Sequence, residues 1–235
     1  MNTLLVCDIG RTRYADAWKL QQQLFAARQA HRIPDILLLT EHEHVYTMGK
    51  TADKNHLLAN DAELAERHID TFNVDRGGDI TYHGPGQLVG YPIIDLSSHY
   101  KDTHRYLRDV EETLIRTLAD LGIDASRHPE YTGVWVGDEK IAAIGVKISR
   151  WITMHGFALN VSTDLRLFDR IIPCGIFHKG VTSIEKILGR NFALSDVAGI
   201  VGPKLSETFN LQHRWIVPED LKNSIREEKG IEVCP

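Results

Sequence analysis

Residues 76–87, RGGDITYHGPGQ, hold four glycines and a proline among polar side chains that could bind a ligand, including Arg76, Tyr82, His83 and Gln87. The spacing is neither G-x-G-x-x-G nor the G-x-x-x-x-G-K-[ST] of a P-loop, so we do not expect a cradle for nucleotide phosphates. A tight crossing of strands would need the same glycines for their unusual φ and ψ values. Composition alone leaves these two interpretations about even, and the recurring polar side chains favour binding.

A second candidate for chemistry is Cys174, which Pro173 and Gly175 bracket in RIIPCGIF. A proline and a glycine on either side of the cysteine predict a defined turn, although a lone cysteine among apolar residues is more often a small buried hydrophobe. Only the thiolate attacks, and a free cysteine has a pKa of about 8.5, so a nucleophile here needs an activator. The candidate activator is Lys140, at the start of KIAAIGVKI; the alternative is a solvated hairpin lysine.

The stretch TEHEHVYTMG (40–49) has side chains that bind metals, but in an unfavourable order. On a strand, alternate residues share a face, so Glu41 would lie with Glu43, or His42 with His44, and never as a His–Glu–His set. Neither H-E-x-x-H nor C-x-x-C occurs in the chain. We therefore expect no bound catalytic metal.

Composition limits the classes of protein to which this chain can belong. The 235 residues are 43% hydrophobic and 25% charged, which suits a globular protein with one large domain, and no apolar run reaches the roughly 18 residues of a membrane span. The N-terminus predicts an opening strand, not a signal peptide. Three scattered cysteines (Cys7, Cys174 and Cys234) point to a reducing cytoplasm. The net charge of −5 disfavours nucleic acid and anionic membranes as partners.

Hydrophobic periodicity predicts an α+β protein, because strands come in runs and helices segregate from them. We expect helices at 13–29, 103–121 and around 165–171, 195–208 and 218–228, strands at 35–41, 72–75, 87–95 and 151–161, and a hairpin at 133–149 that turns at Gly137, Asp138 and Glu139. Two of these strands carry a mid-strand glycine, Gly145 and Gly156. A glycine at such a position often marks a close approach of the backbone to a ligand.

Four segments in this order, RGGDITYHGPGQ, EKIAAIGVKISR, MHGFALNV and IIPCGI followed by VTSI, resemble the lipoyl(octanoyl) transferase family. The resemblance covers roughly residues 37–184 without a departure at any motif position, and no motif follows Arg190. It implies a single catalytic domain (1–235) with the fold of the biotin/lipoate protein ligase catalytic domain. That fold is α+β, a mixed and mainly antiparallel sheet packed by helices.

The resemblance also implies a reaction: transfer of an octanoyl group from acyl carrier protein to a specific lysine of a lipoyl domain, the first step of endogenous protein lipoylation. Cys174 would carry the acyl group as a thioester, Lys140 would lower the cysteine pKa, and no ATP or other cofactor would be needed. Lys140, or His83, would accept the proton of the acceptor lysine. The implied substrate-binding residues are Arg76, Gly77, Gly78, Asp79, Ile80, Thr81, Tyr82, His83, Ala143, Ile144, Gly145, Gly156, Phe157 and Ala158.

The implied partners are octanoyl-acyl carrier protein and two kinds of acceptor, the lipoyl domains of 2-oxoacid dehydrogenase complexes and the glycine cleavage H protein. Because these partners are usually acidic, an enzyme of net charge −5 would need a local basic rim, for which the candidates are Arg11, Arg13, Lys147, Arg150 and Lys179. We expect a monomer. Two rival functions stay open at this point: an ATP-dependent lipoate or biotin ligase of the same fold, which needs no cysteine, and a non-catalytic module that binds acyl carrier protein.

Overall fold

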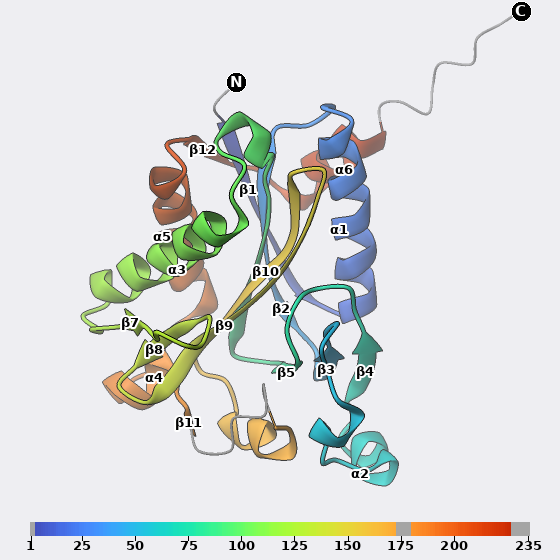
Figure 1. The fold of residues 1–235 in the computed structure, drawn as a ribbon, viewed down its shortest axis with the longest axis vertical. Helices are drawn as coiled ribbons and strands as arrows, with labels where there is room; N and C mark the ends of the chain where they lie inside the picture. Colours follow the sequence, from blue (N-terminus) through green and yellow to red (C-terminus); the bar gives the residue numbers. More distant parts are fainter. Residues whose placement is uncertain (1–2, 173–179, 227–235) are drawn as a thin grey trace, which may run out of the picture.

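The computed structural model describes residues 3–172 and 180–226, and a mixed sheet runs through them (Figure 1). Its strands are β1 (Thr3–Thr12), β2 (Asp35–His42), β6 (Gln87–Ile93), β7 (Ser126–Arg127), β8 (Val134–Val136), β9 (Glu139–Ser149), β10 (Ile152–Asn160), β11 (Gly180–Val181) and β12 (Gln212–Trp215). Their order is β12-β1-β2-β6-β10-β9-β8-β7, with β11 beside β9. Strand β1 runs parallel to β2 and β12, β11 runs parallel to β9, and the other neighbours are antiparallel.

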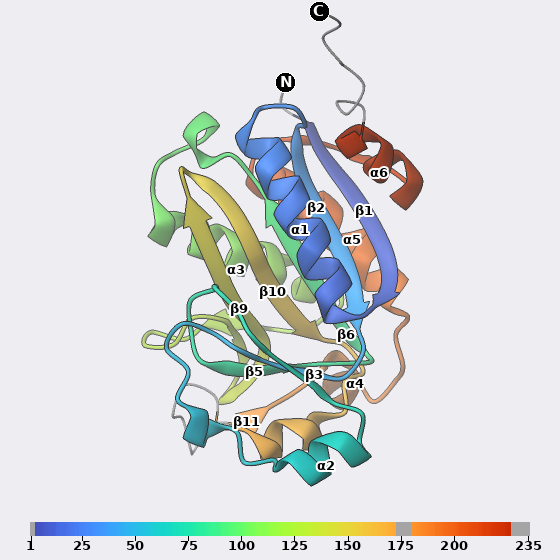
Figure 2. The same ribbon diagram turned by 90° about the vertical axis from the view of Figure 1, so that its right-hand side faces the viewer.

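Helices cover both faces of this sheet, as Figures 1 and 2 show from two sides. On one face lie α1 (Tyr14–Gln29) and α6 (Pro218–Arg226); on the other lie α3 (Thr103–Asp120), α4 (Ile184–Leu188) and α5 (Leu194–Thr208). Strand β2 shows why two cores form. Ile36 and Leu38 pack toward α1, whereas Leu37 and Leu39 pack toward α3 and α5, because successive side chains of a strand point to opposite faces.

The amphipathic pattern predicted for 103–121 produces α3. Tyr106, Val110, Leu114 and Leu118 repeat every four residues and are fully buried, so they form one apolar stripe. The helix begins after Asp102, whose carboxylate accepts a hydrogen bond from the Arg105 N–H at 3.0 Å, a normal N-cap.

A second, smaller sheet lies at one end of the first and was not expected. It consists of β3 (Val45–Met48), β4 (Asp70–Asn73) and β5 (Ile80–His83), in the order β4-β3-β5, and α2 (Asp61–Glu66) lies beside it. Strand β5 lies inside the glycine-rich segment, where no strand was expected. Ile80 and Tyr82 alternate with polar neighbours and are buried in a small core with Phe168, which favours strand over loop.

The other predicted elements are found with shifted ends. The strand predicted at 72–75 is β4 at 70–73, and the one at 87–95 ends at Ile93. The hairpin turns at Gly137 and Asp138, and β9 already begins at Glu139. Within residues 3–172 and 180–226 there are also three short 3-10 helices: Lys54–His56, Leu96–Ser98 and Leu165–Arg170, the last where a helix was expected around 165–171. Among the helices the structure describes, none has the length and apolar character needed to cross a bilayer.

Candidate active site

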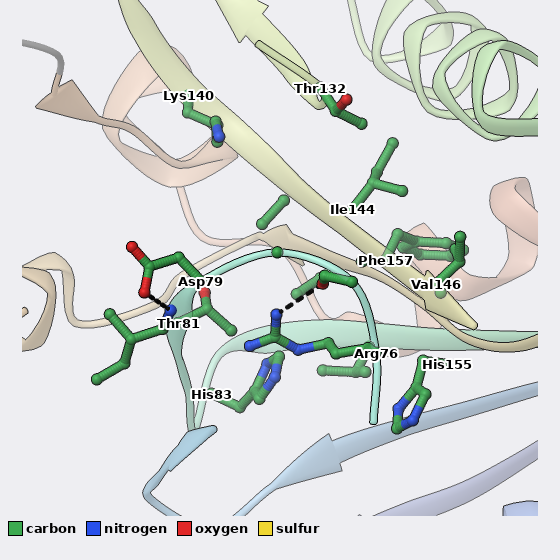
Figure 3. Close-up of a pocket in the computed structure, with 18 of the residues that line it drawn as sticks. Arg76, Asp79, Thr81, His83, Thr132, Lys140, Ile144, Val146, His155 and Phe157 are labelled. Atoms are coloured by element: carbon green, nitrogen blue, oxygen red, sulfur yellow. Dashed lines mark hydrogen bonds between the residues drawn. The ribbon is translucent and has the colours of Figure 1, made fainter. Parts of the chain in front are cut away.

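A pocket of about 510 Å³ lies between the glycine-rich segment and strands β9 and β10 (Figure 3). The segment is anchored to β9 by a hydrogen bond from the Gly77 N–H to the Val146 carbonyl, 2.9 Å. Apolar side chains cover much of the lining; they are Ile80, Val89, Leu107, Ile144, Val146, Phe157, Phe168 and Val181. The space suits a chain-like apolar group of modest size.

The mid-strand glycines allow this close packing. A Cβ added at Gly145 would lie 2.9 Å from Cδ of Arg76 and 3.1 Å from the Gly77 carbonyl oxygen. Gly156 lies directly opposite Gly145 in the β9–β10 pair, and a Cβ there would lie 2.2 Å from the Gly90 carbonyl oxygen. The close approach that these glycines allow is therefore chain against chain, and this crossing is what forms the pocket. The interpretation of the glycine-rich segment as a tight crossing is confirmed, and the same crossing lines a pocket, so its role in binding a ligand stays a prediction.

The charged side chains of the segment are held by the protein itself. The buried Arg76 guanidinium donates from one terminal nitrogen to the Thr47 carbonyl (2.7 Å) and hydroxyl (2.9 Å). Asp79 accepts a hydrogen bond from the Ile80 N–H at 2.7 Å and lies 2.5 Å from Nδ1 of His56. These contacts fix the segment against the small sheet.

The imidazole of His83 faces the same pocket and is buried. Its Nδ1 lies 2.8 Å from Oε1 of Gln87, and its ring stacks on Tyr14 at 6.2 Å between centroids. Burial, reinforced by the nearby His42, lowers the pKa of His83 to about 3. The ring is therefore neutral at physiological pH and a poor base for the acceptor lysine.

A linked set of three side chains that no sequence pattern predicted lies at the end of the pocket far from Lys140, which we call the inner end; His155 lines the pocket there, and Asp75 and Lys147 are linked to it. Nε2 of His155 lies 2.8 Å from Oδ1 of Asp75, and the Lys147 ammonium lies 2.5 Å from the other carboxylate oxygen. His155 has φ +58° and is buried, and burial lowers its pKa. The signal available in the sequence was its place next to Gly156 in the quoted MHGFALNV motif.

Lys140 lies at the opposite end of the pocket (Figure 3). Its ammonium nitrogen lies 4.8 Å from the centre of the Trp135 ring. Its carbonyl accepts a hydrogen bond from the Thr182 N–H at 3.0 Å, and its strand pairs with β11 at Val181. Val146, the register partner of His155, is six residues further along β9, so the two ends are about 20 Å apart.

Cys174 lies outside the described residues, but the chain on both sides of it is held beside the pocket. Before it, the Ile172 N–H donates to the His56 carbonyl at 2.9 Å, and Ile171 bridges to Leu57. After it, Val181 pairs with Lys140 and lines the pocket.

Comparison with known proteins agrees with this geometry. Residues 13–205 match the model of the lipoyl protein ligase A/B catalytic domain. The chain belongs to this family. Over 190 residues it is 57% identical to an octanoyltransferase of Rubrobacter xylanophilus, covering 80% of this chain and 85% of the relative. Over 213 residues it is 52% identical to an octanoyltransferase of Gloeobacter violaceus, covering 90% and 93%. This family membership makes the protein an acyltransferase, and its activity is octanoyl transfer in protein lipoylation.

The fold prediction is confirmed by a solved structure. A putative lipoate protein ligase of T. acidophilum superposes with a TM-score of 0.74 over 97% of this chain and 93% of that one, at 18% sequence identity. The TM-score shows a shared fold, and at this low sequence identity the likeness shows the fold alone. The activity of the octanoyltransferase relatives sets aside both rival functions, the ATP-dependent ligase and the non-catalytic module.

Within this family fold, the residues predicted to bind substrate come together. All of them line the pocket except Tyr82. That side chain is buried behind the wall, where its hydroxyl lies 2.7 Å from Nδ1 of His44 and its ring packs edge-on against Phe168. Tyr82 therefore packs beneath the pocket-lining residues of the glycine-rich segment and supports them.

The histidines of 40–49 do not act together. Strand β2 was predicted at 35–41 and ends at His42, so Glu43 and His44 lie outside it and the alternation considered for a strand does not extend to them. Nε2 of His42 lies 2.7 Å from the Tyr91 hydroxyl, on the pocket side, whereas His44 contacts Tyr82. In the ranges 3–172 and 180–226, no three histidine, cysteine or acidic side chains gather in a way that could hold a metal ion.

Most of the proposed basic rim is already paired within the protein. Arg11 lies 2.7 Å from Glu41, Arg13 lies 3.6 Å from Asp70, and Lys147 is bound to Asp75 at the inner end of the pocket. Arg150 follows β9 at its far end, and Lys179 lies outside the described residues. A basic docking rim remains a prediction.

Proposed function

We propose that octanoyl transfer by this protein follows a ping-pong route through a thioester on Cys174, with Lys140 as its ionic and proton-transfer partner. The observation that carries the proposal is the position of Lys140 at one end of an apolar pocket, paired with the strand that follows the Cys174 segment. His56 and Leu57 hold the residues that precede this segment. The pocket would take the acyl chain, and its Lys140 end would take the reacting carbonyl.

The dimensions support this orientation. An extended octanoyl group is about 9 Å long, because each of its seven C–C bonds of roughly 1.5 Å advances a zigzag chain by about 1.3 Å. From Lys140 to Ile144 the strand advances about 13 Å. A chain entering at Lys140 would therefore end near Ala143 and Ala158, with Ile144 and Phe157 closing the space beyond it, and would not reach Arg76 or His155 at the inner end.

The electrostatics supports thiolate formation. An ammonium about 4 Å from a thiolate, at an effective dielectric constant near 20, contributes about 4 kcal/mol, which corresponds to roughly three pKa units. That is enough to populate the thiolate at neutral pH, since activated cysteines have pKa values of about 3.5–7.5.

The protons balance over the two half-reactions. In the first, the Cys174 thiolate attacks the donor carbonyl; the new C–S bond forms as the bond to the carrier sulfur breaks, and that sulfur takes a proton from the Lys140 ammonium. In the second, the neutral acceptor amine attacks the Cys174 thioester; the C–N bond forms, the C–S bond breaks, and the amine proton passes to neutral Lys140. The ion pair is then restored, and no ATP is consumed.

The partners are proposed on the same chemistry. An acyl donor and a lipoyl-domain acceptor follow from the family. We infer that the donor is octanoyl-acyl carrier protein, and that the acceptors are lipoyl domains of 2-oxoacid dehydrogenase complexes and the glycine cleavage H protein. A reactive free thiol favours the reducing cytoplasm as the compartment.

Intact-protein mass spectrometry tests the route. Wild type, Cys174→Ser and Lys140→Ala are mixed with octanoyl-acyl carrier protein without ATP, and a lipoyl domain is then added. We expect one octanoyl adduct on wild type, none on Cys174→Ser, slow formation on Lys140→Ala, and discharge by the lipoyl domain. Transfer by Cys174→Ser at the wild-type rate would refute the covalent route.

A further inference from the structure

The side chain of Lys140 lies against an aromatic surface that the reaction scheme does not use. Its ammonium nitrogen is 4.8 Å from the centre of the Trp135 ring, within the roughly 6 Å over which a ring face attracts a cation. Trp135 and Lys140 are register partners in the β8–β9 hairpin, so the backbone pairing itself places the ammonium over the ring.

The Trp135 ring is fixed from its other sides. It is 2% exposed, and it packs against His128 at 5.1 Å and Tyr131 at 6.1 Å between ring centroids, which themselves lie 4.8 Å apart. Tyr131 also lines the pocket. The three rings form an aromatic cluster (His128, Tyr131 and Trp135) beside the reacting end.

The lysine stem is held by the same hairpin. Gly133 is buried with φ +128°, and a Cβ there would lie 2.7 Å from the Ala142 carbonyl oxygen and 3.4 Å from Cε of Lys140. The chain at 133 thus passes close along the methylene stem, and only glycine fits. The stem is confined by backbone and the head group by a ring face.

The identity of the ring decides how strongly it attracts the ammonium. Among the aromatic side chains, tryptophan attracts a cation most strongly, and phenylalanine does so less. Substitution of Trp135 by phenylalanine or leucine therefore grades the attraction and tests it.

We propose that Trp135 is a positioning residue for Lys140: its ring face, fixed by His128 and Tyr131, holds the ammonium group at the reacting end of the pocket. This inference rests on the proposed role of Lys140. The ring stabilises the charged lysine and restricts where it can lie, so it keeps the cation where a thiolate needs it. It does not touch the substrate.

The direct test measures Lys140 itself. Competitive acetylation with acetic anhydride across pH, read by peptide mass spectrometry, gives the titration midpoint of its amine in wild type, Trp135→Phe and Trp135→Leu. We expect the midpoint to fall by about one pH unit in Trp135→Leu and by less in Trp135→Phe. Phe209→Leu is the matched control, since it removes a buried ring from the core near α3 and α5 without a contact to Lys140. An unchanged midpoint in Trp135→Leu, together with a loss of thermal stability like that of Phe209→Leu, would overturn the proposal.

A second measurement separates this inference from the proposed function. The rate of Cys174 alkylation by iodoacetamide, followed across pH by peptide mass spectrometry, is expected to have a higher midpoint in both Lys140→Ala and Trp135→Leu. In the double variant Lys140→Ala/Trp135→Leu the shift is expected to equal that of Lys140→Ala, because the ring acts through the lysine. If Lys140→Ala leaves the Cys174 midpoint unchanged, the proposed ion pair is wrong, while the acetylation midpoint still decides whether Trp135 holds Lys140. An equal additional shift by Trp135→Leu with and without Lys140 would contradict the positioning role.

Discussion

The two ends of the pocket differ in the contacts that their charged side chains make. At the inner end, Arg76 is bonded to Thr47, and Asp75 lies between His155 and Lys147. At the other end, the Lys140 ammonium lies against the face of a buried indole and lines the pocket. The inner groups are fixed by these hydrogen bonds and the salt bridge, whereas the contact that distinguishes the Lys140 end is the one between an ammonium and an aromatic ring face.

This difference explains how a polar, glycine-rich wall can serve an uncharged acyl chain. The wall's ionisable groups stabilise the crossing of the small sheet over the large one, and its buried histidines stay neutral. In the proposed reaction, the chemical steps take place at the end where β8, β9 and β11 meet. Substitutions at the inner end should therefore act mainly on stability, and substitutions at the Lys140 end on the rate of the chemical steps.

The largest effect is expected at the reacting end. Lys140→Ala should lower kcat/KM for octanoyl transfer by about a hundredfold or more, as is usual for loss of a proton-transfer group. Circular dichroism and thermal melting should change little, because the side chain is only partly buried. Steady-state kinetics with octanoyl-acyl carrier protein gives the measurement. A loss of kcat/KM below threefold in Lys140→Ala would contradict the view that the Lys140 end, and not the inner end, governs the rate of the chemical steps.

At the inner end, Arg76→Met should mainly destabilise the fold. It removes two charge-assisted hydrogen bonds to Thr47 and leaves buried acceptors without donors, which costs about 2–4 kcal/mol. Urea unfolding measures this cost. The conservative Arg76→Lys should recover only part of it, since an ammonium lacks the planar fork. Full stability in Arg76→Met would show that the wall does not depend on this contact.

The acyl-chain end of the pocket can be tested through Gly90, on β6. A Cβ there would lie 2.1 Å from Cζ of Phe157, so Gly90→Ala should push that ring into the pocket and destabilise the fold by about 1–3 kcal/mol. We expect activity to shift toward donors shorter than octanoyl, measured with carrier proteins loaded with six- and eight-carbon chains. Gly199→Ala in α5 is the matched control, because a Cβ there meets nothing within 4 Å; it should stabilise by about 0.5–1 kcal/mol and leave chain preference unchanged.

The neutral histidines predict a pH dependence of stability. Burial lowers the pKa of His42 to about 4 and that of His83 to about 3, below the unfolded value of about 6.5. Between pH 6.5 and about 4 the unfolded chain binds more protons than the folded one, so stability is present above pH 6.5 and is lost as the pH falls. Urea unfolding at pH 7, 6 and 5 gives the slope of the free energy of unfolding against pH. In His83→Gln this slope should be smaller than in wild type by up to about 1.4 kcal/mol per pH unit. Identical slopes in both proteins would contradict a buried neutral His83.

The smallest effect is expected on the docking surface. Lys147→Glu would also break the contact with Asp75, so Arg150→Glu tests docking more cleanly. Charge reversal at Arg150 should raise KM for the carrier protein about twofold and weaken its salt dependence, with kcat unchanged. Equal KM values at 50 and 300 mM salt in both proteins would place the docking surface elsewhere.

Periodicity and turn residues in the sequence were enough to predict most elements. The four-residue repeat of α3, the apolar run of β2 and the Gly137-Asp138 turn each appear where they were expected. These features depend on neighbours within a few residues, so one chain segment contains its own signal. Of the small sheet only β4 was expected; β3 and β5 were missed because they are four residues each and become strands only by pairing with each other and with β4.

By itself, the sequence determined the fold class, the residue types of the pocket wall and the family of the protein. Only the tertiary structure decided which groups meet. His155 and Asp75 are 80 residues apart in the chain, and no local pattern connects them. Lys140 and Trp135 are close in sequence, but the ammonium reaches the ring because β8 and β9 pair in one register. Contacts across strands depend on register and on which faces the helices cover, and both are set by the burial of the whole core.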